Sequence, residues 1–237
     1  MRSPFRPFAP LFAAFALALA PVACVGGEPQ DGPAAAPNDE LGGDVPPLFD
    51  GKTLDGWTGE KDLWSVQMID DVPTIVGVSE GLDHNTFLTT DRTFGDFDLT
   101  FEMKLTPNDA NSGIQFRSVR IAEEEGEKPG PDSEMRGYQA DAGAGWWGKL
   151  YEENGRGMLY PAEGKPDQTS AEDALKPGEW NVYRISAEGD RVRTWINGAP
   201  SVDLVDPEGR KEGMIGLQMH SGGPMTVRFR RFVLQTP

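Results

Sequence analysis

Three short segments of the sequence place polar side chains at every second position, beside apolar ones. Side chains alternate across a β-strand, so residues two apart share a face. The polar positions of these segments are Gln115 and Arg117, Gln139 and Asp141, and Gln218 and His220. A carboxylate, an imidazole and several amides on one face suit proton transfer and directional hydrogen bonds with hydroxyls. The alternative is that this face is an ordinary solvated surface.

A glycine-rich segment with two adjacent tryptophans, Trp146 and Trp147, directly follows the second of these segments. Adjacent side chains of an extended chain point in different directions. We therefore expect one indole to lie in the core and the other to form an exposed platform for the apolar face of a sugar ring. Lys149 and Glu152 follow closely. Arg156, in the next glycine-rich turn, is either a turn residue or a clamp for a ligand.

The residues that could support other kinds of catalytic or metal centre are scarce. The chain has two histidines, His84 and His220, and one cysteine, Cys24. No His-Glu-x-x-His signature and no Cys/His zinc spacing can be formed from them. We expect no serine-hydrolase chemistry and no cofactor. A metal would need oxygen ligands, which favours a structural Ca²⁺ over Zn²⁺.

The elements that must position these residues are predicted to be β-strands. The clearest alternating runs of apolar and polar residues are 97–105, 181–187, 191–196, 199–204 and 225–234. Asn197-Gly198 is a strong signal for a hairpin turn. Residues 170–175 are the best helix candidate, and the polar stretches 120–135 and 161–178 indicate surface loops. The sequence predicts an all-β fold of ten to twelve short strands in an antiparallel sandwich of two sheets.

The first 23 residues have the layout of a secretory signal peptide, with arginines followed by a short apolar run. Cys24 comes next, as the lipidated cysteine of a bacterial lipoprotein does, so we expect export and a lipid anchor. Residues 24–46 are rich in Gly, Pro, Ala and acids and predict a flexible tether. We expect residues 47–237 to fold as one monomeric domain at the periplasmic or outer-membrane face of the cell envelope.

The charge of the chain restricts its partners. The net charge is −16, and loss of the two arginines of the signal peptide would make it −18. Such a surface repels phosphate backbones and anionic lipid head groups. We therefore expect no nucleic-acid partner and no membrane contact except through the lipid, whereas a neutral carbohydrate is compatible with this charge.

Five segments, occurring in this order, resemble the 3-keto-disaccharide hydrolase family. They are residues 48–57, 111–117, 137–141, 178–181 and 216–220. The resemblance covers about residues 47–235 and implies a concanavalin A-like jelly-roll sandwich. It also implies hydrolysis of glycosides whose glucose C3 hydroxyl has been oxidised to a ketone. Many members of the family have Glu where this chain has Gly137.

The chemistry of such a substrate can be derived from the ketone. A ketone at C3 acidifies the hydrogen on C2, so a base can remove it, the glycosidic oxygen on C1 leaves by elimination, and water adds back. On this scheme Asp141 or Glu152 is the base, and Arg117, Gln139 or His220 steadies the enolate oxygen. The other polar and aromatic positions are expected to bind the sugar: Gln115, Trp146, Trp147, Lys149, Arg156 and Gln218.

A non-catalytic carbohydrate-binding module is the alternative, because β-sandwiches host both lectins and hydrolases. A base and an enolate donor in one pocket would favour the enzyme. An aromatic platform with hydrogen-bonding groups is sufficient for a binding module. A third possibility, a surface adhesion or scaffold protein, predicts a flat surface near Trp146 and Arg117.

Overall fold

The computed structural model describes residues 46–127, 130, 134–161 and 171–237. These residues form two seven-stranded antiparallel sheets. The expected signal peptide, Cys24 and all of the expected tether except Pro46 lie outside the described residues. None of the helices in the described part of the chain is long and apolar enough to cross a membrane.

The first sheet contains the strands that carry most of the predicted site residues. In spatial order its strands are β1 (Trp57–Thr58), β4 (Thr86–Thr90), β13 (Met214–Met219), β6 (Asn111–Arg120), β7 (Met135–Gly143), β8 (Leu150–Glu153) and β9 (Gly157–Tyr160). Neighbours in this order pair antiparallel, so segments far apart in the sequence become adjacent in space.

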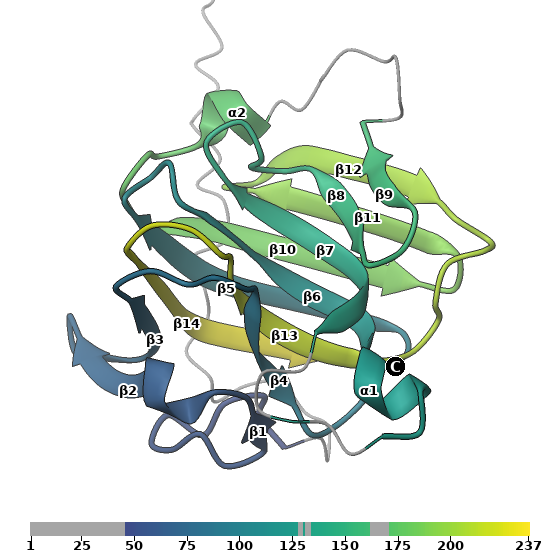
Figure 1. Cartoon of the computed structure of the whole chain (residues 1–237). Coiled ribbons are helices and arrows are strands. Elements are labelled where there is room, and N and C mark those ends of the chain that lie inside the picture. The colour runs from purple at the N-terminus through teal and green to yellow at the C-terminus, as the bar shows by residue number, and fades with distance from the viewer. Residues whose placement is uncertain (1–45, 128–129, 131–133, 162–170) are drawn as a thin grey trace, which may run out of the picture. The chain divides into compact units, whose positions relative to one another are not determined.

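The second sheet lies against the first. In spatial order its strands are β12 (Ala199–Val205), β11 (Arg191–Ile196), β10 (Asn181–Glu188), β5 (Phe97–Thr106), β14 (Met225–Gln235), β3 (Val72–Ser79) and β2 (Trp64–Ile69). Figure 1 shows β6, β7 and β13 as one layer over β5, β10 and β14. Buried apolar residues of both sheets form one core. The all-β jelly-roll sandwich predicted from the sequence is therefore confirmed.

Aromatic side chains fill the space between the sheets. Phe116 stacks on Tyr138 within the first sheet, with ring centroids 5.3 Å apart. Phe97 of the second sheet meets Phe116 edge-on at 6.1 Å. Such pairs add about 0.5–1.5 kcal/mol each to the stabilisation from burial. They also fix which face of β6 and β7 points into the core, and so which face points outward.

The predicted strands of the second sheet are confirmed. In β5 the residues Phe97, Leu99, Phe101, Met103 and Leu105 are buried and the polar residues between them are partly exposed. Asn197 and Gly198 both have positive φ, 50° and 83°, as the tight hairpin between β11 and β12 requires.

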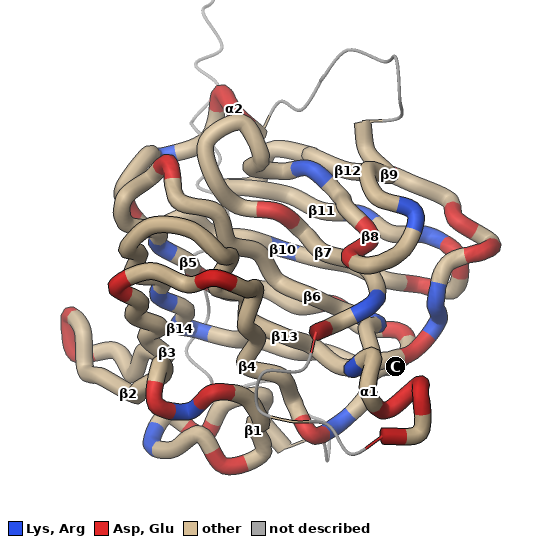
Figure 2. Tube along the Cα trace, in the orientation of Figure 1, with Lys and Arg blue, Asp and Glu red and all other residues tan. Residues whose placement is uncertain are grey.

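The remaining elements are short. A 3₁₀ turn, η1, spans Lys61–Leu63, and the one-turn helices are α1 (Ile121–Glu124) and α2 (Ala171–Ala174). The expected helix at 170–175 is thus a single turn within the described residues. The expected loop at 120–135 begins with the last residue of β6 and with α1, and part of it lies outside the described residues. Basic residues are interspersed with acidic ones along the trace in the view of Figure 2.

A β-bulge in β6 changes the direction of one predicted site residue. Arg117 has a φ of 46°, and the register of β6 shifts there against both β7 and β13. An extra residue in one strand re-aims the side chains that follow it. Simple alternation along 112–118 therefore holds as far as Phe116 and fails at Arg117.

Candidate active site

The outward face of the first sheet brings together predicted residues from three strands. Gln115 of β6 lies opposite Gln139 of β7, which lies opposite Tyr151 of β8. In the next row Gly113 lies between Asp141 and Gln218. Directly opposed residues share a face of a sheet, so these positions form one polar surface.

A chain of hydrogen bonds runs along this face and ends on the carboxylate of Asp141. Ser118 Oγ lies 2.6 Å from Gln115 Oε1, Gln115 Nε2 donates to Gln139 Oε1 at 2.9 Å, and Gln139 Nε2 donates to Asp141 Oδ1 at 2.7 Å. Gly113 leaves room for this chain, because a Cβ there would lie 2.8 Å from Gln139 Cγ. Both amides are thereby fixed in orientation, and Oδ1 of Asp141 is held as an acceptor.

The other oxygen of Asp141, Oδ2, is buried and has no hydrogen-bond partner among the described residues. The residue is only 2% exposed. Burial, partly opposed by the hydrogen bond from Gln139, raises the pKa of Asp141 to about 7. Near neutral pH this carboxyl can therefore both take and release a proton, as a general base must.

Asp141 lies in a small pocket of about 140 Å³, which we call the carboxylate pocket. Its other ionisable residues are Glu153, Tyr151 and His220, and its remaining lining residues are Asn111, Gln139 and Trp146. Burial and the negative charge of Glu134 raise the pKa of Glu153, with His220 acting in the opposite direction. Asn111 Oδ1 is a second buried oxygen without a partner in the described part of the chain.

His220 has a defined tautomer in its neutral form. Nδ1 lies 2.8 Å from the carbonyl oxygen of Ser221, and a carbonyl can only accept. The proton of the neutral ring therefore belongs on Nδ1, and Nε2 is left as an acceptor. The neighbouring Ser221 is in turn held by Asn85, whose Oδ1 accepts its backbone N–H at 2.9 Å.

The two tryptophans occupy different environments. Trp147 is 2% exposed and belongs to the core, whereas Trp146 is 38% exposed and lines the carboxylate pocket. Lys149 Nζ lies 5.5 Å from the centroid of the Trp146 ring. One core indole and one accessible indole is the arrangement expected from the sequence, and Trp146 is the one that can meet a ligand.

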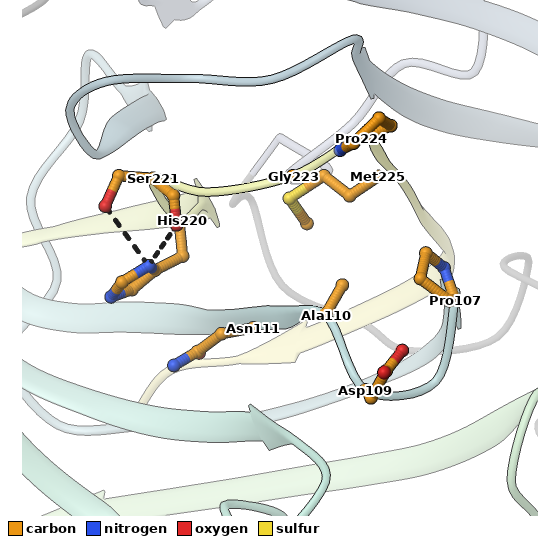
Figure 3. Close-up of a pocket in the computed structure, with 9 residues that line it drawn as sticks. All are labelled: Pro107, Asp109, Ala110, Asn111, His220, Ser221, Gly223, Pro224 and Met225. Atoms are coloured by element: carbon orange, nitrogen blue, oxygen red, sulfur yellow. Dashed lines mark hydrogen bonds between the residues drawn. The ribbon is translucent and has the colours of Figure 1, made fainter.

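A second, larger pocket of about 370 Å³ adjoins the first, and we call it the proline pocket. The two pockets share Asn111 and His220. Figure 3 shows His220 and Ser221 on the side opposite Pro107 and Asp109, with Asn111 and Ala110 between them. The two hollows are therefore parts of one site.

Two predicted residues, Glu152 and Arg156, lie on the other face of the same strands. Arg156 donates to both oxygens of Asp206, at 2.9 and 2.6 Å, and also binds Glu152. Tyr138 donates to Asp206 Oδ2 at 2.5 Å. We call Tyr138, Glu152, Arg156 and Asp206 the Arg156 cluster. Its contacts connect β7, β8 and the β8–β9 turn to the segment after β12.

The carboxyl groups of the Arg156 cluster have lowered pKa values, whereas those of the carboxylate pocket have raised ones. The hydrogen bonds from Arg156 lower the pKa of Asp206 to about 2. Burial works against ionisation of Glu152, but the bonds from Arg156 outweigh it and the pKa of Glu152 is lowered. The carboxylates of this cluster therefore stay ionised and paired at neutral pH, which suits a structural role. Glu153, the next residue, takes the place in the pocket that was expected for Glu152.

Arg117 and Gln218 also lie outside the lining of the two pockets. The Arg117 guanidinium donates to the carbonyls of Gly95 and Gly189 at 2.9 and 2.8 Å and to Asp96 at 2.8 Å. It thus ties the bulge to turns of the second sheet. Gln218 is fully buried beside Gly113, and neither atom of its amide has a partner among the described residues.

The glycine at position 137 is explained by the same bulge, which lies opposite it in β6. Its φ is 145°, and a Cβ there would lie 2.4 Å from Ser118 Oγ. No side chain fits this backbone. Gly137 lies directly opposite Glu153, so a carboxylate reaches this part of the face from β8 instead.

Two other kinds of site receive no support. No group of three or more His, Cys, Asp or Glu side chains that could hold a metal ion occurs within the described residues. Gly77-Val78-Ser79-Glu80-Gly81 matches the Gly-x-Ser-x-Gly spacing of a serine-hydrolase elbow. However, Ser79 is a buried residue at the end of β3, no helix follows it, and its Oγ accepts the N–H of Gly81 at 2.9 Å.

Sequence reasoning missed three pocket residues, Asn111, Tyr151 and Glu153. Asn111 lies two residues before Gly113 and four before Gln115, so alternation along β6 was a usable signal for it. The positions of Tyr151 and Glu153 in the pocket depend on the register in which β8 pairs with β7, and alternation along a single strand does not give that register.

Comparisons with known proteins agree with this fold. The model of the 3-keto-alpha-glucoside-1,2-lyase-like domain matches residues 44–235. No curated protein sequence matches the chain. Two solved structures of candidate glycosyl hydrolases from Parabacteroides distasonis share the fold. One is 19% identical, with a TM-score of 0.53 over 81% of this chain and 98% of that one. The other is 18% identical, with a TM-score of 0.51 over 79% and 91%. The chain therefore belongs to the 3-keto-α-glucoside 1,2-lyase-like family, a carbohydrate-related family.

Proposed function

We propose that this protein cleaves glycosides whose glucose unit carries a ketone at C3, with Asp141 as the base. The observation that carries this proposal is Asp141 itself. One of its oxygens is held by Gln139, the other is buried without a partner among the described residues, and its pKa is raised to about 7. A structural carboxylate at such a position would be expected to have a partner.

The reaction begins with transfer of the C2 proton of the sugar to Asp141 Oδ2. The electrons of the C2–H bond form an enolate whose charge rests on the C3 oxygen. The C1–O bond then breaks, the leaving oxygen takes a proton, and a C1–C2 double bond remains beside the restored ketone. Addition of water, with OH to C1 and H to C2, completes a net hydrolysis. General-base catalysis of this kind contributes about 10²–10⁴-fold to the rate.

The other residues of the pocket have separate roles in this scheme. The amide of Asn111 and the hydroxyl of Tyr151 are neutral donors for the enolate oxygen. Glu153, whose pKa is raised by burial, keeps a proton at higher pH than an exposed glutamate and can supply the leaving oxygen. The exposed face of Trp146 is a platform for the pyranose ring. Gln115 and Gln139 act through Asp141, by holding it in place.

The test is the release of sugars from a purified 3-keto-disaccharide. The wild type and Asp141→Asn are compared with a matched control, Asp62→Asn, because Asp62 is an exposed aspartate on η1 that lines neither pocket. We expect release by the wild type and the control, and a loss of about 10²–10⁴-fold in the pocket variant. Equal release by all three proteins would contradict the role of Asp141.

A carbohydrate-binding module is the second candidate, favoured by the exposed Trp146 beside Lys149. The same experiment separates the two. Binding of the keto sugar without any release, weakened by Trp146→Ala and unaffected by Asp141→Asn, would favour a binding module over an enzyme.

We also propose that the protein is exported and anchored through a lipid on Cys24, on the basis of the N-terminal sequence. In cells that express the full chain, labelled palmitate should be incorporated into the wild type and not into Cys24→Ser. Labelling of both proteins, or of neither, would contradict the anchor.

A further inference from the structure

The proline pocket begins where the carboxylate pocket ends, at Asn111 and His220. At about 370 Å³ it is the larger of the two. Asp141 lines only the carboxylate pocket, so a sugar whose C2 is presented to Asp141 must lie there. C1 is bonded to C2, so the glycosidic oxygen on C1 can face the boundary between the pockets at Asn111 and His220. Whatever is attached to that oxygen can extend into the proline pocket.

The walls of the proline pocket are chemically different from those of its neighbour. Four of its lining residues are apolar: Pro107, Ala110, Pro224 and Met225. Asn111 and His220, which it shares with the carboxylate pocket, are polar, and Figure 3 shows Ser221 beside His220, on the side opposite Pro107. Asp109 is the one residue of the lining that is acidic, and neither Lys nor Arg contributes to it.

We propose that the proline pocket is the subsite for the leaving group and that it favours a neutral, apolar aglycone over a second sugar. This inference rests on the proposed function. An apolar ring against Pro107, Pro224 and Met225 removes apolar surface from water on both sides. A second sugar would bury hydroxyl groups against the same walls, where they lose hydrogen bonds to water without replacement. An anionic aglycone is disfavoured by Asp109, since neither Lys nor Arg lines the pocket.

Three 3-keto-glucosides test the proposal, carrying methyl, cyclohexyl and glucosyl groups on the C1 oxygen. Cyclohexanol is the most basic of the three leaving alcohols and a sugar hydroxyl the least, so a higher kcat/KM for the cyclohexyl compound reports contacts of the leaving group rather than its reactivity. We expect the cyclohexyl compound to exceed both others by about tenfold, from burial of its ring.

Gly223 also lines the proline pocket, so Gly223→Leu, which adds a bulky side chain to this lining, is the variant that should remove the preference. A Cβ on Gly223 has no atom within 4 Å, and its φ lies outside the positive range, so a side chain can be added without strain. We expect kcat/KM for the cyclohexyl compound to fall about tenfold while the value for the methyl compound stays within about twofold. The methyl compound is thus an internal control for folding and for the base.

The outcomes distinguish this proposal from the function on which it rests. Turnover of all three compounds without a preference for cyclohexyl, or an equal loss with both substrates in Gly223→Leu, would overturn the aglycone subsite alone. Absence of turnover with every compound would overturn the proposed function and, with it, this inference.

Discussion

The two faces of β7 and β8 both carry carboxyl groups, but the pKa values of these groups are shifted in opposite directions on the two faces. Tyr138 and Glu152 point to one face and join Arg156 and Asp206. Their chain neighbours Gln139 and Glu153 point to the other face and line the carboxylate pocket. On the first face the carboxylates have a cationic partner and lowered pKa values, whereas Asp141 and Glu153 on the second have raised ones.

This difference separates residues that hold the structure from residues that are available for chemistry. A paired carboxylate gains free energy from its partner and has little reason to take up a proton. A buried carboxylate without a partner costs folding free energy and is ready to accept one. Sites of this second kind are retained where they serve a function, often at the expense of stability.

The largest expected effect is that Asp141→Asn stabilises the fold while it lowers turnover by about 10²–10⁴-fold. Asp141 has a folded-state pKa of about 7 and a reference value of 3.8. Because the pKa of Asp141 is higher in the folded state, the carboxyl is protonated below about pH 4 and costs no folding free energy there. The free energy of unfolding falls as the pH rises through 7 and the carboxyl must ionise. We expect the variant to be more stable at pH 8 by on the order of 2–4 kcal/mol, with no gain at pH 4. Denaturant unfolding at both pH values measures this, and a variant that is less stable at pH 8 would contradict it.

The next effect concerns the opposite face, where Arg156→Ala should destabilise the fold by roughly 2–3 kcal/mol. This is below the usual cost of breaking a buried ion pair, because Arg156 is partly exposed. Asp206 has a lowered pKa, so its contribution is present above pH 4 and is lost as pH falls towards 2. The difference in unfolding free energy between the wild type and the variant should therefore shrink as the pH falls towards 2. A difference in unfolding free energy that does not change with pH would mean that the ion pair between Arg156 and Asp206 does not cause the loss of stability.

Gly137→Ala tests how closely β7 packs against the bulge in β6. With φ at 145° and a Cβ placed 2.4 Å from Ser118 Oγ, alanine is strained at this position. We expect a loss of about 2 kcal/mol or more, read from thermal unfolding. Gly222→Ala is a control for this backbone conformation alone, since Gly222 has a φ of 135° and open space around its Cβ. Equal losses in the two variants would show that crowding by the bulge is unimportant.

The smallest effects come from the adjacent pair Glu152 and Glu153. Glu152→Gln should lower the free energy of unfolding by about 1 kcal/mol through loss of a charge-assisted bond to Arg156 and leave the pH–rate profile unchanged. Glu153→Gln should raise the free energy of unfolding slightly at pH 8, because burial raises the pKa of Glu153, and should remove the alkaline limb of the pH–rate profile. The opposite result, a changed pH–rate profile in Glu152→Gln and a loss of stability in Glu153→Gln, would show that Glu152 rather than Glu153 acts in the pocket.

Much of the fold could be predicted from the sequence because alternation is a local property of a strand. Residues 97–105 alternate without interruption, and Asn197-Gly198 marks its hairpin. The same rule placed Gln139 and Asp141 on one face. It could not place Arg117, since the bulge at that residue has no glycine or proline to announce it. Nor could it choose between Glu152 and Glu153, because that choice depends on the pairing of β8 with β7.

The most direct test of the central claim isolates proton removal from C2. A 3-keto derivative of 1,5-anhydroglucitol has no glycosidic oxygen on C1, so its C2 hydrogen can be exchanged without release of an aglycone. In D₂O we predict that the wild type, followed by NMR, replaces this hydrogen with deuterium and that Asp141→Asn does so about 10²–10⁴-fold more slowly. Exchange at equal rates in both proteins, or no exchange above the uncatalysed rate in the wild type, would contradict the assignment of Asp141 as the base.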